Sequence, residues 1–182
     1  AATPHPARVP VPFRRNGITG YTIYEMGFLC YAEKEKEGTF RMAHVEKYTA
    51  AAVGHMLGHY GRSPDDGVKR SNENIDPERT HLNYNLAPDH EGGQVAFLKN
   101  RLAQVKVQKR ADVNVLCDWV VTLPQGNYTP DQDREFFQRS YDFLSARYGE
   151  SNVVSAYVHM DESQPHLHFA FIPVVPDRRR GH

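Results

Sequence analysis

The segment VHMDESQPHLHF, residues 158–169, holds three histidines and two carboxylates within ten residues. Strand-forming runs lie on both sides of it: residues 151–158 are rich in β-branched side chains, and residues 169–175 are almost wholly apolar. This arrangement predicts a β-hairpin with the histidines near its turn. On the second strand His166 and His168 are two residues apart, so we expect their side chains to point to the same face of the sheet.

The hairpin predicts a metal site. His159 ends the first strand, and a turn through Pro165 would bring it opposite the histidine pair. Three neutral ring nitrogens around one point suit a divalent metal with open coordination positions, which metal catalysis requires. A lone histidine at a hairpin is more often an ordinary polar side chain, but three at this spacing beside acids favour the metal site. We therefore predict His159, His166 and His168 as metal ligands.

Composition sets broad limits on the chain. Its 182 residues are enough for one domain core. The 22 Lys and Arg balance 22 Asp and Glu, so the overall charge gives no sign of nucleic-acid binding and any basic surface must be local. Cys30 and Cys117 form no CxxC pair, which fits a reducing cytoplasm. No apolar run is long enough to span a membrane. We expect residues 1–38, which begin with a Pro-rich stretch, to form a poorly ordered appendage.

From residue 39 the sequence pattern is regular. Alternation and helical spacing predict, in order, a strand over 39–47, a helix over 50–60, a polar loop, a basic helix over 97–110, a strand over 112–123, and a helix after Thr129 that ends at Gly149. Together with the hairpin, these elements predict an α+β domain over residues 39–182, with an antiparallel β-sheet and helices packed on its faces.

Two polar regions leave their roles open. His55 and His59 share a helix face, but without a third ligand nearby in sequence such a pair is only a weak metal signal. Residues 72–84 are dense in amides and carry an arginine and a tyrosine, which suits either a polar loop or contacts to phosphates and bases. The basic helix is either a solvated face or a surface for a phosphate backbone.

Several strings together resemble one protein family. His166-Leu167-His168 has the His-hydrophobe-His form of the HUH endonucleases, and VHMDESQPHLHF is similar to the metal motif of the MobV-type plasmid mobilisation relaxases, also called the Mob/Pre family. Three further strings resemble blocks of that family and occur in the same order: NENIDPERTHLNYNL at 72–86, DVNVLCDWVVTLP at 112–124 and YGESNVVSAYVHMDES at 148–163. The resemblance covers about residues 39–176.

The resemblance implies a metal-dependent enzyme that nicks one DNA strand at a specific site, the origin of transfer of a plasmid or mobile element, and then transfers it. The family's metal is Mn²⁺ or Mg²⁺, held by the histidines that match His159, His166 and His168. A histidine in a HisxxArg context, matched here by His59, attacks the phosphodiester and stays linked to the 5′-phosphate; Tyr60 is the competing nucleophile. Glu162 would accept the proton of the nucleophile, fix its tautomer, or orient a ligand histidine.

The same resemblance implies the partners and the surroundings. We expect contacts with single-stranded and supercoiled plasmid DNA in the bacterial cytoplasm. Relatives continue into a dimerising region, so we expect residues 39–182 to be a C-terminally truncated catalytic domain, with any homodimer formed through regions outside this chain. The candidate DNA contacts are Arg62, Asn72, Asn74, Arg79, Asn83 and Tyr84.

Two other functions stay open at this point. A hydrolytic nuclease would use water on the histidine-bound metal and would leave no covalent protein–DNA adduct. An inactive fragment of a relaxase would bind metal or DNA without cleavage.

Overall fold

A computed structural model describes residues 13–15, 18–20, 43–62, 74–108 and 110–174. The chain divides into two compact units, Ala1–Phe40 and Arg41–His182. In the first unit, strands β1 (Phe13–Arg15) and β2 (Ile18–Gly20) pair antiparallel, although the sequence predicted no regular element there. All other described elements belong to the second unit.

The second unit is built on a five-stranded antiparallel sheet. The strands lie in the order β3-β5-β7-β6-β4, so that β7 is central and the β6–β7 hairpin is flanked by β5 on one side. The predicted α+β fold with an antiparallel sheet is confirmed. The strands are β3 (Ala43–Thr49), β4 (Tyr84–Asn85), β5 (Asn114–Thr122), β6 (Val153–His159) and β7 (His166–Phe171).

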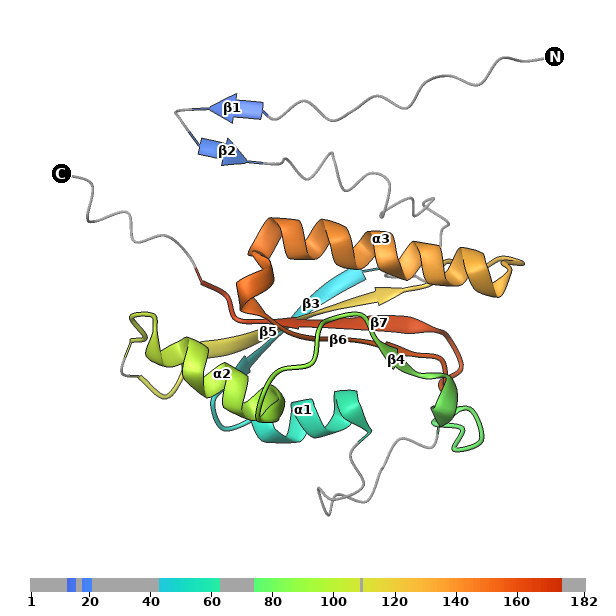
Figure 1. The fold of residues 1–182 in the computed structure, drawn as a ribbon, viewed down its shortest axis with the longest axis horizontal. Helices are drawn as coiled ribbons and strands as arrows, with labels where there is room; N and C mark the ends of the chain where they lie inside the picture. The colour runs from blue at the N-terminus through green and yellow to red at the C-terminus, as the bar shows by residue number, and fades with distance from the viewer. Residues whose placement is uncertain (1–12, 16–17, 21–42, 63–73, 109, 175–182) are drawn as a thin grey trace, which may run out of the picture. The chain divides into compact units, whose positions relative to one another are not determined.

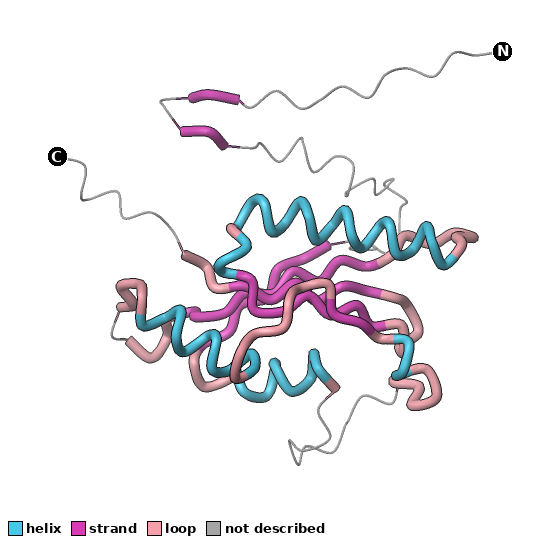
Figure 2. The backbone as a smooth tube through the Cα atoms, in the orientation of Figure 1, coloured by secondary structure: helices cyan, strands magenta, loops and turns pink. Residues whose placement is uncertain are grey.

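Helices cover both faces of this sheet (Figures 1 and 2). Helix α3 lies on one face, and α1 and α2 lie on the other. The helices are α1 (Val53–Gly61), α2 (Gly93–Ala103) and α3 (Pro130–Tyr148), and the 3₁₀ turns are η3 (Thr80–Leu82) and η4 (Glu150–Asn152). None of the helices in the described residues is long and apolar enough to cross a lipid bilayer.

The alternation of β7 explains why two different layers form. Phe169 and Phe171 contact the rings of Tyr141 and Tyr148 on α3, and both phenylalanines are buried. Ala170 points the other way, into a core that the apolar side chains of α1 and α2 share with β5 and β6. Because successive strand residues alternate between faces, His166 and His168 lie on the α1 face with Ala170.

Helix α3 begins and ends where the sequence predicted. The hydroxyl of Thr129 accepts a hydrogen bond from the backbone N–H of Gln132, and the side chain of Gln132 accepts one from the backbone N–H of Thr129. This reciprocal capping box satisfies two of the free N–H groups at the helix start. Gly149 follows the last turn with φ of 86°, a conformation that glycine adopts without strain.

Other predicted boundaries were wrong or lie outside the described residues. The basic helix ends at Ala103, so Lys106 and Arg110 follow it, and Lys109 is not described. Leu98 and Leu102 pack into the core, but the next positions on that face include lysines, which cannot continue the buried stripe. The segment predicted as a polar loop contains η3 and the short strand β4. Strand β7 includes His166 and His168 as predicted, but it ends at Phe171, before the end of the apolar run 169–175.

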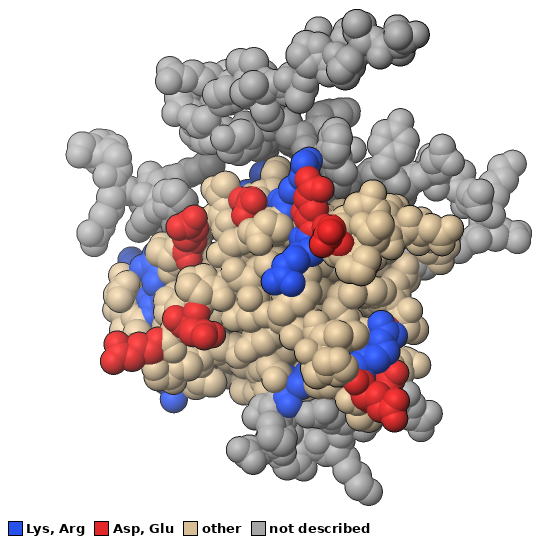
Figure 3. Space-filling model, turned by 45° about the vertical axis from the view of Figure 1, so that its right-hand side comes forward, with Lys and Arg blue, Asp and Glu red and all other residues tan. Residues whose placement is uncertain are grey.

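Charged side chains are interspersed on the surface. Among the described residues on the face shown in Figure 3, acidic and basic side chains lie next to one another rather than in a broad patch of one sign. This agrees with the balance of 22 basic and 22 acidic residues in the whole chain.

Candidate metal centre

The three histidines predicted as metal ligands lie on one face of the central hairpin. His166 and His168 lie near the start of β7, and His159, the last residue of β6, pairs in register with His166. The ring centroids of His159 are 5.3 Å from His166 and 4.9 Å from His168, and those of His166 and His168 are 4.8 Å apart. Strand periodicity and cross-strand pairing therefore bring all three imidazoles together.

One nitrogen of each ring faces a hydrogen-bond acceptor. Nε2 of His159 lies 2.8 Å from a backbone carbonyl oxygen of α1, and Nδ1 of His166 lies 2.9 Å from a carbonyl oxygen of the turn. Nδ1 of His168 lies 2.6 Å from a carboxylate oxygen of Asp118. Because carbonyl and carboxylate oxygens only accept, the nitrogen facing them carries the proton in a neutral ring. The other nitrogen of each histidine keeps its lone pair.

These lone pairs are arranged as a cation would require. Nε2 of His166 and Nε2 of His168 are 3.1 Å apart, although both lack a proton in these tautomers. Nδ1 of His159 is buried and has no hydrogen-bond partner among the described residues. Facing lone pairs repel one another, and a buried nitrogen without a partner costs free energy. A divalent cation among them removes both penalties, so the donors present fit a metal ion.

A fourth imidazole joins this cluster from α1. The ring centroid of His59 is 5.7 Å from that of His159 and 5.6 Å from that of His168. In the described part of the chain, two sets of three donor atoms lie within 4.8 Å of one another: His59 with His159 and His168, and His159 with Glu162 and His166. The predicted trio is thus divided between two sets that share His159.

Helix α1 carries two other residues that the sequence analysis considered, His55 and Tyr60. His55 lies one helical turn before His59 and is exposed to solvent. Tyr60 is fully buried in the core between α1 and the sheet, and its ring lies 4.8 Å from that of His168. Burial, followed by the charge of Asp118, raises the pKa of the Tyr60 hydroxyl far above its ordinary value of 10.0.

Arg62 joins the end of α1 to the turn of the hairpin. Its guanidinium donates to both carboxylate oxygens of Asp161, at 3.1 and 2.8 Å, and to Glu162 at 2.6 Å. Thr80 donates a further hydrogen bond to Asp161 at 3.0 Å. Burial lowers the tendency of these carboxylates to ionise, but the bonds to Arg62 outweigh it, and the pKa of Asp161 falls to about 2 while that of Glu162 is also lowered. The α1 end and the metal-binding turn are therefore fixed to each other.

Asp118 is a site residue that the sequence analysis missed. It is fully buried on β5, where it pairs with Ala170. Val120, two residues further along the same strand face, pairs with His168, so Asp118 lies diagonally beside His168. In the sequence it was one polar position in an alternating strand, 50 residues before His168. Carboxylates in this position orient a metal-binding imidazole and fix its tautomer. No local pattern distinguished it from a solvent-facing aspartate.

Burial also sets the protonation of the cluster. It lowers the pKa of His159 from 6.5 to about 3, lowers that of His168 well below 6.5, and lowers that of His59, and neighbouring positive groups add to these shifts. Burial raises the pKa of Asp118 from 3.8 to about 7. At neutral pH these three histidines are therefore neutral, which is the form in which an imidazole binds a metal or attacks an electrophile.

The predicted DNA contacts fall into two groups. Asn74 is exposed and Arg79 is half-buried at the start of η3, whereas Asn72 lies outside the described residues. Asn83, Tyr84 and Arg62 make the following contacts within the fold. The side-chain oxygen of Asn83 accepts a hydrogen bond from the backbone N–H of Met160 at 2.7 Å. The guanidinium carbon of Arg134 lies over the ring of Tyr84, 4.7 Å from the ring centroid. Arg62 is buried and forms an ion pair with Asp161.

Fold and site together define a class of protein: an α+β domain whose central antiparallel hairpin presents a cluster of neutral histidines suited to a catalytic metal. Residues 38–181 match the family described as "Plasmid recombination enzyme" (Mob_Pre), and the chain belongs to this family. The resemblance to MobV-type relaxases that the sequence motifs indicated is confirmed.

Individual relatives support this assignment. The chain is 31% identical over 144 residues to a plasmid recombination enzyme of Bacillus thuringiensis, covering 77% of this chain and 32% of the relative. It is 33% identical over 142 residues to one of Streptococcus agalactiae, covering 74% and 28%. The chain thus spans about a third of the length of these relatives.

Solved structures show the same fold. The relaxase domain of MobM (MOBV; Mob_Pre), in a Mn-bound crystal structure with plasmid pMV158 oriT DNA, aligns with a TM-score of 0.63 and 29% sequence identity, covering 75% of this chain and 76% of that domain. A second Mn-bound crystal structure of the same domain with oriT DNA, at pH 4.6, gives a TM-score of 0.62.

Proposed function

We propose that this domain is an HUH-type relaxase that nicks one strand of plasmid DNA at an origin of transfer, with His59 as the nucleophile. The observation that carries the proposal is the position of the His59 ring, 5.6–5.7 Å from two of the three hairpin histidines. The nicking of oriT DNA is supported by family membership and by the MobM relaxase domain, which is similar in fold and is bound to oriT DNA. The bacterial cytoplasm, where plasmids reside, is the proposed location.

His159, His166 and His168 are the proposed ligands of a divalent metal, Mn²⁺ or Mg²⁺. The support comes from their fixed tautomers and facing lone pairs, and from the manganese bound by the MobM domain. When bound, such a cation polarises a phosphate and stabilises the charge that develops on its non-bridging oxygens. Asp118 holds His168 in the orientation that leaves its Nε2 free to bind.

The chain's own residues supply the nucleophile and the proton acceptor. A lone pair of the neutral His59 ring attacks the phosphorus, a P–N bond forms, and the bond to the 3′ oxygen of the preceding nucleotide breaks. The DNA fragment that carries the 5′ phosphate stays attached to His59 through that phosphate. The released 3′ oxygen of the other fragment takes up a proton from solvent. Glu162, which Arg62 holds in its ionised form, accepts the proton that the His59 ring loses. The P–N bond conserves the energy needed for resealing.

A second candidate function has its own observation. His59 belongs to one of the two sets of donor atoms, so it is also placed to bind a metal as a fourth imidazole. In that case water would attack the phosphate, and the domain would be a hydrolytic nuclease that forms no adduct. Tyr60 is a weak alternative as nucleophile because its hydroxyl is buried and strongly held in its protonated form.

An adduct assay separates these functions. The 182-residue chain would be incubated with Mn²⁺ and a pool of single-stranded oligonucleotides of random sequence labelled at the 3′ end, then resolved on a denaturing gel. A relaxase gives a labelled band at the mass of the protein plus DNA, whereas a hydrolase gives only shortened DNA and an inactive domain gives neither.

Variants on α1 then identify the nucleophile. We expect His59→Ala to abolish the adduct, while Tyr60→Phe retains it. His55→Ala is the matched control, because this exposed histidine lies one turn away on the same helix. Adduct formation by His59→Ala would refute the proposed nucleophile.

A further inference from the structure

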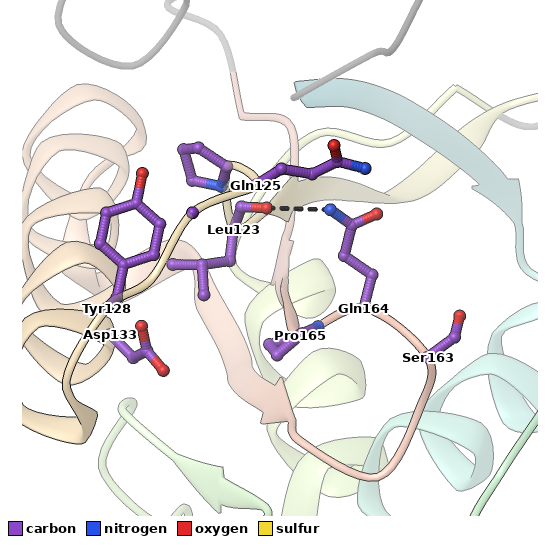
Figure 4. A pocket seen from close by; sticks show the side chains of 9 residues that line it. Leu123, Gln125, Tyr128, Asp133, Ser163, Gln164 and Pro165 are labelled. Atoms are coloured by element: carbon purple, nitrogen blue, oxygen red, sulfur yellow. Dashed lines mark hydrogen bonds between the residues drawn. The ribbon is translucent and has the colours of Figure 1, made fainter.

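A hollow of about 510 Å³ lies beside the metal-binding turn and takes no part in the proposed chemistry. It is formed by the loop after β5, the first turn of α3 and residues 163–165 of the turn between β6 and β7 (Figure 4). Ser163 directly follows Glu162, and Pro165 directly precedes His166. The hollow and the candidate metal centre therefore share the turn that joins β6 to β7.

One wall of the hollow is an aromatic ring held in place by the backbone. Tyr128 is 44% exposed although it is a large hydrophobic side chain. Its ring packs directly on Gly126, where an added Cβ would come within 2.8 Å of ring atoms. Leu123 and Pro165 also line the hollow, and Figure 4 shows Leu123 between Tyr128 and Pro165. A fixed and exposed ring beside a second apolar surface suits a flat ligand that stacks, as nucleobases do on aromatic side chains.

The polar groups in the hollow include acceptors on Asp133 and Gln164. Oδ1 of Asp133 is buried and has no hydrogen-bond partner within the described residues. The amide nitrogen of Gln164 donates to the backbone oxygen of Leu123 at 3.2 Å, which leaves the amide oxygen of Gln164 available. None of the residues that line the hollow is a lysine or arginine. The lining therefore suits a base with several N–H groups rather than a phosphate.

We propose that this hollow is a binding site for a guanine base of the single-stranded DNA. Guanine presents N1–H and an amino group side by side, a pair of donors that suits the acceptors of the hollow, the carboxylate of Asp133 and the amide oxygen of Gln164. Tyr128 stacks on the base. The inference rests on the proposed relaxase function, and it adds a residue set that selects the DNA sequence, which the metal centre alone cannot do.

Binding in EDTA tests this inference without any cleavage. The probes are three fluorescent 12-nucleotide single strands: alternating dG and dT, the same strand with hypoxanthine in place of guanine, and dT alone. Hypoxanthine keeps N1–H but lacks the amino group, so it removes one donor and little else. We expect the guanine strand to bind the 182-residue chain roughly tenfold more tightly than the hypoxanthine strand, as for one hydrogen bond to a charged acceptor.

Three variants connect this preference to the hollow. Asp133→Asn is expected to abolish the difference between guanine and hypoxanthine. Asp131→Asn is the matched control, since this exposed acid lies in the same first turn of α3 but does not line the hollow, and it should leave the difference unchanged. Tyr128→Ser should weaken binding of all three strands roughly 5- to 150-fold, and Tyr128→Phe should restore it.

The inference is overturned if Asp133→Asn keeps the guanine preference, or if Tyr128→Ser binds all strands as tightly as the wild type. Either result is independent of the adduct assay. A wild type that forms the adduct but shows no guanine preference would remove this inference alone, whereas a guanine preference without an adduct would remove the strand-transfer proposal alone.

Discussion

Replacing Arg62 by leucine removes the cation from a buried ionic network. The side chains of Arg62 and Asp161 are 5% and 0% exposed, and that of Glu162 is 15% exposed. The substitution leaves the fully buried carboxylate of Asp161 without its bidentate partner. Breaking such a pair from one side costs about 3–5 kcal/mol, because a buried charge is left uncompensated. Since domains of this size are stable by about 5–15 kcal/mol, we expect Arg62→Leu to bring the domain close to unfolding.

A second substitution tests the cause of this loss. In the Arg62→Leu background, Asp161→Asn removes the charge that has lost its partner, so the double variant should be more stable than Arg62→Leu alone. The pH dependence gives an independent check. The pKa of Asp161 is about 2 in the folded state, below its ordinary value of 3.8, so the stabilisation is present above pH 4 and is lost as the pH falls towards 2. Arg62→Leu should lack this loss.

Urea denaturation followed by circular dichroism measures these effects. The matched control is Arg139→Leu, whose ion pair with Glu135 is exposed, at 69% and 60% of the side chains, and should contribute less than about 1 kcal/mol. The reasoning is refuted if Arg62→Leu lowers the free energy of unfolding by less than about 1 kcal/mol, or if the double variant is no more stable than the single one.

Two further predictions concern the histidine cluster. Asp118→Asn should lower Mn²⁺ affinity about 10- to 100-fold in calorimetric titrations, while Asp112→Asn, which alters an exposed ion pair, should not; equal affinities would contradict the orienting role of Asp118. Burial keeps the folded pKa of His159 near 3 against 6.5 in the unfolded chain, so the free energy of unfolding should fall by roughly 5 kcal/mol as the pH decreases from 6.5 to 3. His159→Gln should flatten this dependence, and an equally steep fall in that variant would exclude His159 as its source.

The parts of the site that the sequence predicted depend on short-range geometry. His166 and His168 share a face because strand residues alternate, and the turn length places His159 opposite them. The ends of α3 were predictable because Thr129 and Gly149 satisfy the free backbone groups of that helix locally. In each of these cases the deciding interactions join residues that are near one another in the sequence.

The parts that the sequence did not predict depend on tertiary pairing. Asp118 reaches His168 only through the register of β5 and β7, and Arg62 pairs with Asp161 across 99 residues of sequence. The contacts of Tyr84 with Arg134 and of Asn83 with the backbone of Met160 likewise join segments that are far apart in the sequence, and the prediction that these two residues contact DNA stays a prediction. Neither composition nor periodicity contains that information.

The order of strands has a consequence for synthesis of the protein on the ribosome. Strand β7 is the last of the five to be translated, yet it lies between β5 and β6, which emerge earlier. Until β7 leaves the exit tunnel, β5 keeps one open edge and β6 pairs only with the two residues of β4. Such edges invite pairing with other chains, so the nascent domain passes through an aggregation-prone stage. This aggregation-prone stage ends when β7 pairs with β5 and β6. Because β7 also carries His166 and His168, the step that closes the sheet also brings these two histidines into place.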